Sequence, residues 1–148
     1  MTRIVRGVVT LVLAGTLIGA MAGVADAKPL SESQFKKQGD AICKAGNKAL
    51  DPVYEQYFGD LGENEEPDQA SIDAVLVVIV PNIQGQIDAV DALEEPKSLS
   101  KGVAKFLAEA QRALDVLDAD HSLFIGSDDL FAKTSKLAKK VGLKACAS

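Results

Sequence analysis

The chain has 148 residues, a formal net charge of −5, two cysteines, one histidine and no tryptophan. This length suits a single domain with one hydrophobic core. A net-acidic chain is a poor candidate for nucleic-acid binding, because contacts to phosphate backbones depend on lysine and arginine. We therefore expect no nucleic-acid partner.

The first 27 residues predict a secretory signal peptide. Arg3 and Arg6 give a positive start, residues 7–25 carry no charge, and alanines occupy the −3 and −1 positions of a cleavage after Ala27. The alternative is an uncleaved anchor, because 19 uncharged residues nearly span a bilayer. Seven of these residues after Val12 are Gly or Ala, which makes the segment only moderately apolar and favours cleavage.

Cleavage leaves one mature domain of residues 28–148, secreted and not membrane-spanning. Removing Arg3, Arg6 and Asp26 leaves 14 basic against 20 acidic residues, a net charge of −6. The first cysteine is Cys43, far from the cleavage site, so the sequence predicts no lipid anchor there.

Residues 31–58 predict the first helix of the domain. Ser31 and Gln34 have the spacing of a capping box, with the serine at the N-cap and the glutamine at N3. Apolar residues then recur near helical spacing at Phe35, Ile42, Ala49, Val53 and Tyr57. Pro52 should kink or break this helix. Alternatively, Asp51-Pro52 caps a short second piece.

A polar stretch over 59–68 predicts a loop, and a second helix is expected to open at Pro67 or Ser71. Its apolar seam continues to Leu93, which favours a helix over a strand. Within it, residues 74–80 are apolar all round but too few to span a membrane. Pro81 should bend the helix, and Glu95-Pro96 should end it.

Two more helices complete the pattern. Ser98 or Ser100 is expected to cap the third, and a fourth is expected to start at residues 127–129, after Gly126. Gly142 and Leu143 fit a Schellman ending of that helix. Four amphipathic segments with short connections predict an all-α fold, an up-and-down four-helix bundle.

Cys43 and Cys146 predict one disulfide, because an even pair of cysteines in an exported protein is usually bridged. The alternative is a pair of free or intermolecular thiols. The bridge would tie the tail after the fourth helix to the first helix, and these helices are neighbours in an up-and-down bundle.

Four motifs give the chain a family resemblance. They are Lys-Gln-Gly-Asp-Ala-Ile-Cys-Lys-Ala-Gly-Asn at 37–47, Val-Pro-Asn-Ile-Gln-Gly-Gln-Ile at 80–87, Leu-Glu-Glu-Pro at 93–96 and Val-Gly-Leu-Lys-Ala-Cys at 141–146. Together they resemble small exported or lipid-anchored helical proteins of actinobacteria, with a cysteine in the first helix and a terminal Gly-Leu-x-x-Cys. The resemblance implies a helical domain and a Cys43–Cys146 bridge, and it supplies no catalytic residues.

The sequence offers no recognisable catalytic or metal-binding set. It lacks a phosphate loop, a G-x-S-x-G elbow, H-E-x-x-H and C-x-x-C. Di-metal bundle sites need E-x-x-H pairs on facing helices, and His121 is the single histidine. We therefore expect no enzyme, no cofactor and no metal. An unrecognised enzyme with His121 as base is the alternative.

Charge is unevenly distributed along the chain. Between Lys48 and Lys97 every charged residue is acidic, whereas residues 132–148 carry only basic ones. Both runs are compatible with plain solvated faces. The basic run is also a candidate partner face, made of Lys133, Lys136, Lys139, Lys140 and Lys144. The acidic residues of the 59–68 loop could hold Ca²⁺ weakly.

The apolar run of the second helix is the other candidate site. Val75, Leu76, Ile79 and Ile83 are expected in the core, or at an apolar ligand pocket opened by the Pro81 bend, or at a dimer patch. From these features we expect a non-catalytic exported bundle that binds a protein or cell-envelope partner. The alternative is a carrier of a small apolar ligand.

Overall fold

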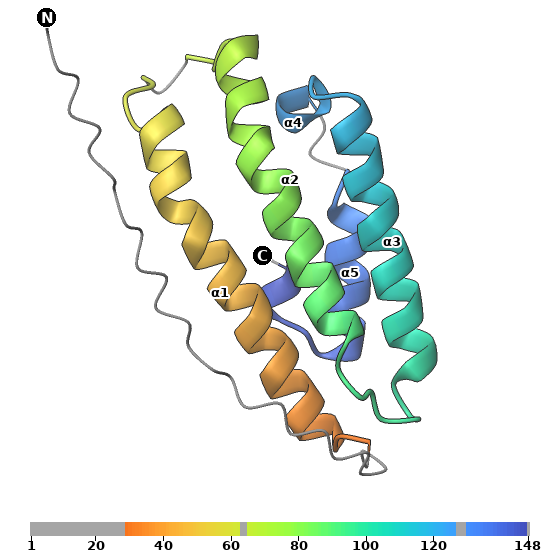
Figure 1. Ribbon diagram of the computed structural model, residues 1–148. Coiled ribbons are helices and arrows are strands. Elements are labelled where there is room, and N and C mark those ends of the chain that lie inside the picture. Colours follow the sequence, from red (N-terminus) through yellow and green to blue (C-terminus); the bar gives the residue numbers. More distant parts are fainter. Residues whose placement is uncertain (1–28, 63–64, 127–129, 148) are drawn as a thin grey trace, which may run out of the picture.

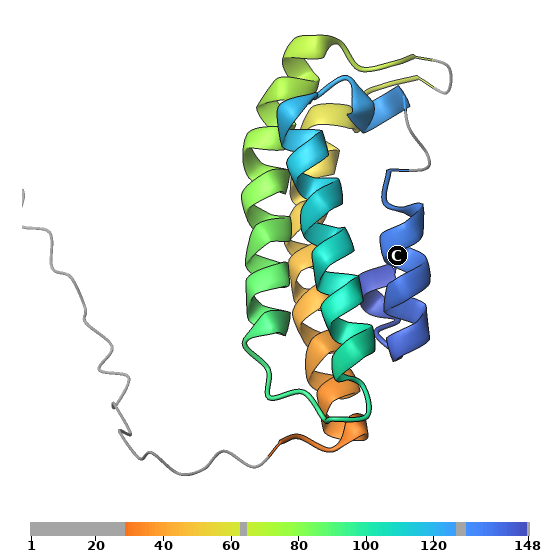
Figure 2. The same ribbon diagram turned by 90° about the vertical axis from the view of Figure 1, so that its right-hand side faces the viewer.

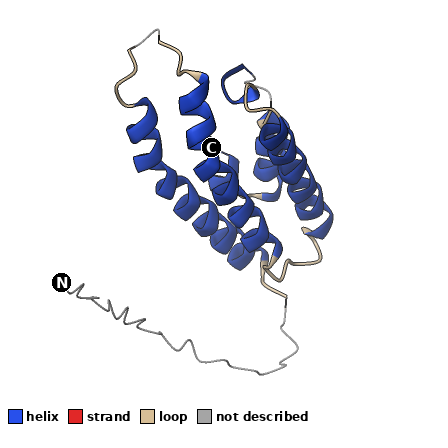
Figure 3. Ribbon diagram, turned by 45° about the horizontal axis from the view of Figure 1, so that its top comes forward, coloured by secondary structure: helices blue, strands red, loops and turns tan. Residues whose placement is uncertain are grey.

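The computed structural model describes residues 29–62, 65–126 and 130–147, and it is helical throughout that part of the chain, with no strand (Figures 1 and 3). The predicted signal peptide and the predicted fourth-helix start at 127–129 lie outside the described residues. The elements are α1 (Glu32–Phe58), α2 (Gln69–Asp91), α3 (Ser100–Ala119), α4 (Leu123–Gly126), α5 (Ala132–Val141) and the 3₁₀ turn η1 (Ala145–Ala147).

Helix α1 begins at the predicted capping box. It then continues past Pro52, where a kink or a break was predicted. The Ser31 side chain accepts a hydrogen bond from the Gln34 backbone, and the Gln34 side chain accepts one from the Ser31 backbone, which confirms the capping box. The prediction of a break at Pro52 is wrong, because α1 continues through it to Phe58. Leu50 and Val53 on either side pack into the core, and this packing holds the helix together across the missing hydrogen bond.

Helix α2 starts one residue after its cap, Asp68, whose side chain accepts a hydrogen bond from Ser71 N at 2.8 Å. It contains Pro81 and ends at Asp91, before the predicted stop at Glu95-Pro96. Its best 18-residue window has a mean hydropathy of 1.4, so by length and composition α2 could cross a membrane. A core helix of a water-soluble protein has the same properties, and six residues of α2 are buried in the bundle.

The chain after α2 departs most from the predictions. The residue before α3 is Leu99, and no side chain caps the helix. Ser98 instead donates its hydroxyl to Glu32 Oε1 at 2.7 Å. The one-turn helix α4 was not predicted, and α5 has only 10 residues against 20–27 in α1, α2 and α3.

The helices pack in chain order, α1 on α2, α2 on α3 and α3 on α5. Figure 2 shows α5 beside α3, on the side away from α2. The turn η1 lies between α1 and α5 and contacts both (Figure 1). The fold is therefore a helical bundle in which the chain's tail fills the space between the first and last helices.

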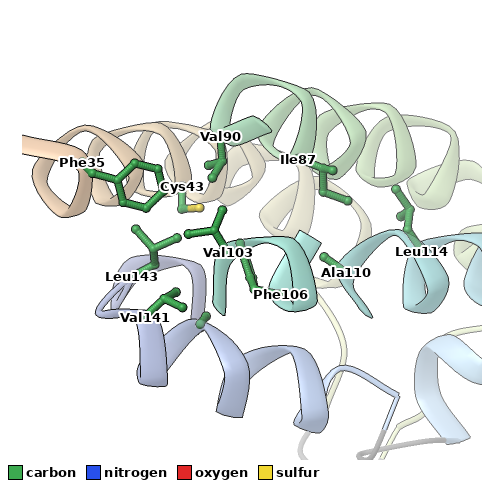
Figure 4. Close-up of a cluster of buried hydrophobic side chains, with 11 residues drawn as sticks. Phe35, Cys43, Ile87, Val90, Val103, Phe106, Ala110, Leu114, Val141 and Leu143 are labelled. Atoms are coloured by element: carbon green, nitrogen blue, oxygen red, sulfur yellow. The ribbon is translucent and has the colours of Figure 1, made fainter. Parts of the chain in front are cut away.

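The most deeply buried side chains form two clusters. The disulfide cluster takes residues from α1, α2, α3, α5 and the tail (Figure 4): Phe35, Cys43, Ile87, Val90, Val103, Phe106, Ala110, Leu114, Ala138, Val141 and Leu143. The distal cluster takes residues from α1, α2 and α3 alone: Leu50, Ile72, Val75, Leu76, Ile79 and Leu117. Val80 and Ile83 of α2 are partly buried and pack against both clusters, so they join the two clusters into one core.

The tail is fastened to α1 at several points. Cys43 and Cys146 form the predicted disulfide, with their Cα atoms 5.1 Å apart. Ala145 N donates to Asp40 Oδ1 at 2.9 Å, and Ala145 O accepts from Asn47 Nδ2 at 3.1 Å. Asp40, Cys43 and Asn47 are spaced by three and four positions, which places them on one face of α1.

A Schellman ending turns the chain from α5 into this tail, as predicted. Gly142 has a φ of 88°, and Leu143 N donates to Ala138 O at 2.9 Å. Leu143 is fully buried against Gly39, where an added Cβ would meet its Cδ2 at 2.5 Å. The glycine thus lets the tail approach the α1 backbone.

Candidate functional site

A partly open cavity of about 320 Å³ lies in the core of the bundle. Every helix and the tail contribute to its wall. The lining residues are Cys43, Asn47, Leu50, Tyr54, Ile79, Ile83, Gln86, Ile87, Val90, Phe106, Ala110, Leu117, Leu123, Phe124, Leu130, Phe131, Thr134, Ser135 and Cys146. The disulfide is therefore part of the cavity wall.

The cavity lies between the two clusters. Its wall includes Cys43, Phe106 and Ala110 of the disulfide cluster, together with Leu50 and Ile79 of the distal cluster. Ile83, which packs against both clusters, also lines the cavity.

The length of α5 accounts for the position of the void. Alongside the disulfide cluster, α5 and the tail complete the bundle, and Val141 and Leu143 are buried there. Alongside the distal cluster, the described part of the chain supplies α4 and the turn residues 130–131, where the partly buried side chains are Leu123, Phe124, Leu130 and Phe131.

Among the described residues, no charged side chain lines the cavity, although a quarter of the chain's residues are charged. The polar residues of the wall are Asn47, Gln86, Thr134 and Ser135, plus the Tyr54 hydroxyl. Tyr54 is 40 % exposed, and its partial burial raises the pKa of its hydroxyl above the usual 10.0. At neutral pH the described part of this wall is therefore uncharged and mainly apolar.

Two of these polar groups already have protein partners. Asn47 Nδ2 donates to the tail at Ala145 O, and Gln86 Nε2 donates to Asn82 Oδ1 at 2.7 Å. Thr134 differs, because it is only 6 % exposed and its Oγ1 has no hydrogen-bond partner among the described residues. A buried hydroxyl without a partner is unusual in a native fold and calls for a reason.

The four apolar residues singled out in the sequence lie inside the bundle. Val75, Leu76 and Ile79 are 2 % exposed or less, and Ile83 is partly buried. Of these, Ile79 and Ile83 line the cavity, whereas Val75 and Leu76 pack in the distal cluster. Pro81 is exposed and is not part of the cavity wall.

The outer side of α2 carries the exposed part of the apolar run. Val77 is 73 % exposed and Val78 is 42 % exposed. Neither residue was among the four singled out, because a run that is apolar all round does not indicate which side faces the solvent.

The lysines of the candidate partner face are all exposed, but they are not equivalent. Lys133 Nζ lies 2.6 Å from Glu109 Oε2, and Arg112 binds the other oxygen of the same carboxylate at 2.6 Å. The side chain of Glu109 is 7 % exposed, and the hydrogen bonds from Arg112 and Lys133 lower its pKa below the usual 4.5. Lys133 therefore helps to hold α5 on α3.

The remaining four lysines have no ion pair with any described residue: Lys136, Lys139, Lys140 and Lys144. They leave one side of α5 and the tail positively charged.

His121 has a partner that the sequence did not reveal. Its Nδ1 lies 2.8 Å from Asp73 Oδ1, across 48 positions of chain, and this hydrogen bond lowers the pKa of Asp73 below 3.8. No described hydroxyl or thiol is hydrogen-bonded to the other ring nitrogen. The pair links α2 to the turn that precedes α4.

The acidic 59–68 loop is described only in part, because Glu63 lies outside the described residues. Glu65 Oε2 accepts a hydrogen bond from Gly62 N, and Asp68 caps α2. No group of three or more His, Cys, Asp or Glu side chains in the described part of the chain is arranged to hold a metal ion.

The residues that close the cavity at α4 and α5 were not predicted from the sequence. Phe124, Leu130 and Phe131 are apolar residues close to the predicted start of the fourth helix, and no sequence pattern distinguishes Thr134.

Comparisons of the chain with family models, curated proteins and solved structures find no match.

Proposed function

We propose that this protein binds a small apolar molecule in the cavity between α1, α2, α3 and α5, as a carrier rather than a catalyst. The single observation that carries the proposal is the cavity itself, about 320 Å³ with a mainly apolar, uncharged wall. Ligand pockets in proteins start near this size, and an apolar cavity of about 150 Å³ already holds benzene.

The energetics of an empty cavity support an occupant. At about 24 cal/mol per Å³, a void of 320 Å³ would destabilise the fold by up to about 8 kcal/mol if it were fully enclosed. Domains of this size are stable by about 5–15 kcal/mol in total. The opening to solvent reduces the penalty, but a bound apolar molecule would remove most of it.

The proposal assumes that the chain is an up-and-down four-helix bundle in which α5 is the short fourth helix. The packing order α1, α2, α3, α5 supports this topology. The proposal also assumes that the domain is secreted after cleavage at Ala27. Outside the cell, an apolar molecule needs a carrier to move through water. The predicted signal peptide supports this location.

Filling the cavity tests the proposal. Ala110 is buried on the cavity wall, so Ala110→Leu should place three carbon atoms in the void. We expect affinity for the fluorescent probe N-phenyl-1-naphthylamine to fall roughly tenfold or more, while the melting temperature rises. Ala108→Leu is the matched control, because Ala108 is exposed on the same helix.

Equal probe affinity in Ala110→Leu and the wild-type protein would show that the cavity is not the binding site. Native mass spectrometry of the protein purified from its own host gives an independent measurement. A bound mass supports the proposal, and a bare polypeptide counts against it.

A second candidate function is docking of an acidic protein or cell-envelope partner on the basic side of α5. The observation that favours it is that Lys136, Lys139 and Lys140 are exposed without ion pairs among the described residues. Changing these three lysines to glutamate should abolish capture of such a partner. Lys133 is left unchanged in this experiment, because it has a structural contact to Glu109.

A further inference from the structure

The cavity wall indicates which class of apolar molecule fits it. A purely hydrocarbon ligand would leave the Thr134 hydroxyl buried without a partner, and burial of an unpaired hydroxyl is unfavourable. A ligand with one hydrogen-bonding group could satisfy it. We infer that the ligand is a neutral amphiphile, an apolar body with a single hydroxyl, carbonyl or ester group that hydrogen-bonds to Thr134. This inference rests on the proposed function and names its ligand class.

The position of Thr134 supports this assignment. Threonine in a helix commonly satisfies its hydroxyl on a backbone carbonyl three or four residues earlier. In this structure Thr134 Oγ1 makes no such bond, although the residue is buried on α5. The hydroxyl oxygen itself is buried. A change of χ1 rotamer moves it to another position on Cβ, from which it can turn toward a ligand in the cavity that Thr134 lines.

The charge of the wall restricts the ligand class further. No lysine, arginine, aspartate or glutamate among the described residues contributes to the cavity wall. An ionised carboxylate or phosphate among these residues would lose its hydration without gaining a counter-charge, which is strongly unfavourable. A hydroxyl can both donate and accept hydrogen bonds, so it suits a neutral alcohol, ketone or ester. Fatty alcohols and fatty esters fit these requirements, and ionised fatty acids do not.

The other polar groups on the wall are less suited to recognise the ligand. The amide nitrogens of Asn47 and Gln86 are engaged with Ala145 and Asn82. Ser135 is only partly buried, so water can satisfy its hydroxyl in the unbound protein. Thr134 therefore carries the specificity. Ser33, which is exposed on α1 and does not line the cavity, provides a control hydroxyl.

The experiment compares 1-octanol, n-octane and octanoate as competitors of N-phenyl-1-naphthylamine. The variants are Thr134→Val, which keeps the shape and removes the hydroxyl, Thr134→Ser, which keeps the hydroxyl, and the control Ser33→Ala. In Thr134→Val we expect the affinity for 1-octanol to fall roughly tenfold and the affinity for n-octane to stay within about twofold of wild type. Thr134→Ser should keep the wild-type preference for 1-octanol because it keeps the hydroxyl, and Ser33→Ala should keep it because Ser33 is not part of the cavity wall. Octanoate at pH 8 should compete least well in every variant.

The outcomes separate this inference from the proposed function. If Thr134→Val changes 1-octanol and n-octane equally, or if octanoate competes as well as 1-octanol, the ligand class is wrong while the cavity remains a binding site. If neither the probe nor any competitor binds the wild-type protein, the proposed function itself fails. Thr134→Val should fold, because it removes an unpaired polar atom from the interior, and its melting temperature checks this.

Discussion

The disulfide cluster and the distal cluster share helices α1, α2 and α3 but differ in what covers their fourth side. Around the disulfide cluster, α5 and the tail supply buried side chains such as Val141 and Leu143. Around the distal cluster, the chain supplies partly buried residues such as Phe124 and Phe131. The same three helices therefore give close packing where α5 and the tail complete the bundle, and they leave a cavity between the two clusters. Side chains that are packed on every side are expected to contribute more to stability than side chains on the cavity wall, which includes Cys43, Phe106 and Ala110 of the disulfide cluster.

Removing the disulfide should have the largest effect on the free energy of unfolding. The bridge joins residues 103 positions apart. In the chain-entropy model, a loop of this length is worth about 4 kcal/mol or slightly more. We expect the double variant Cys43→Ala/Cys146→Ala to lose a large part of this free energy of unfolding, measured by urea denaturation. A loss below about 1 kcal/mol would mean that the hydrogen bonds of the tail alone hold it on α1.

Truncation of one fully buried side chain and of one cavity-wall side chain should distinguish close packing from the cavity. Leu143 is fully buried in the disulfide cluster, so Leu143→Ala should lower the free energy of unfolding by about 3 kcal/mol. Ile83 is partly buried on the cavity wall, so Ile83→Ala should cost about 1 kcal/mol, because some of its contacts are already missing. Equal losses in denaturant titrations would contradict the comparison.

Acid should weaken the attachment of α5 to α3. The pKa of Glu109 is lower in the folded protein than its usual 4.5, because Arg112 and Lys133 donate hydrogen bonds to the carboxylate. The ionised form therefore stabilises the fold above about pH 4.5, and this contribution is lost as pH falls through the lowered value. Melting temperatures of wild type and Glu109→Gln should differ at pH 7, and the difference should shrink as the pH falls below 4.5. A difference that does not shrink with acidification would show that the ion pairs are not its source.

Removing the His121–Asp73 pair should have the smallest effect on stability and on probe binding. The side chains are 33 % and 53 % exposed, and exposed ion pairs contribute little to stability. We expect His121→Gln to lower the melting temperature only slightly at pH 6 and to leave probe binding within about twofold of wild type. A larger loss of binding would place this pair among the contacts that position α4 at the cavity.

The features that the sequence revealed are those with local signals. The capping box at Ser31 and Gln34 and the Schellman ending at Gly142 each depend on residues within five positions, so they could be read directly. The cysteine pair was predictable because only one intramolecular pairing exists. The prediction of a break at Pro52 was wrong, because tertiary packing of α1 outweighed the local tendency of proline to end a helix.

The cavity and its neighbours could not be predicted in the same way. Asp40 and Asn47 hydrogen-bond to the tail residue Ala145, about a hundred positions further along the chain. Asp73 contacts His121, which is 48 positions away. The void depends on where α5 begins, and its start at Ala132 carries no side-chain cap to mark it. The pairing of distant residues and the length of one uncapped helix are set by the packed structure.

The burial of Leu143 against Gly39 also constrains the order in which the chain can fold. Phe35 and Leu143 belong to the same cluster although 108 positions separate them. At about 5–20 residues per second, α1 is synthesised roughly 5–20 s before its partner in the tail exists. During that interval the apolar face of α1 has no tail to cover it. Chaperones that bind exposed apolar helices should therefore recognise nascent forms of this chain, and should release it once the tail has docked.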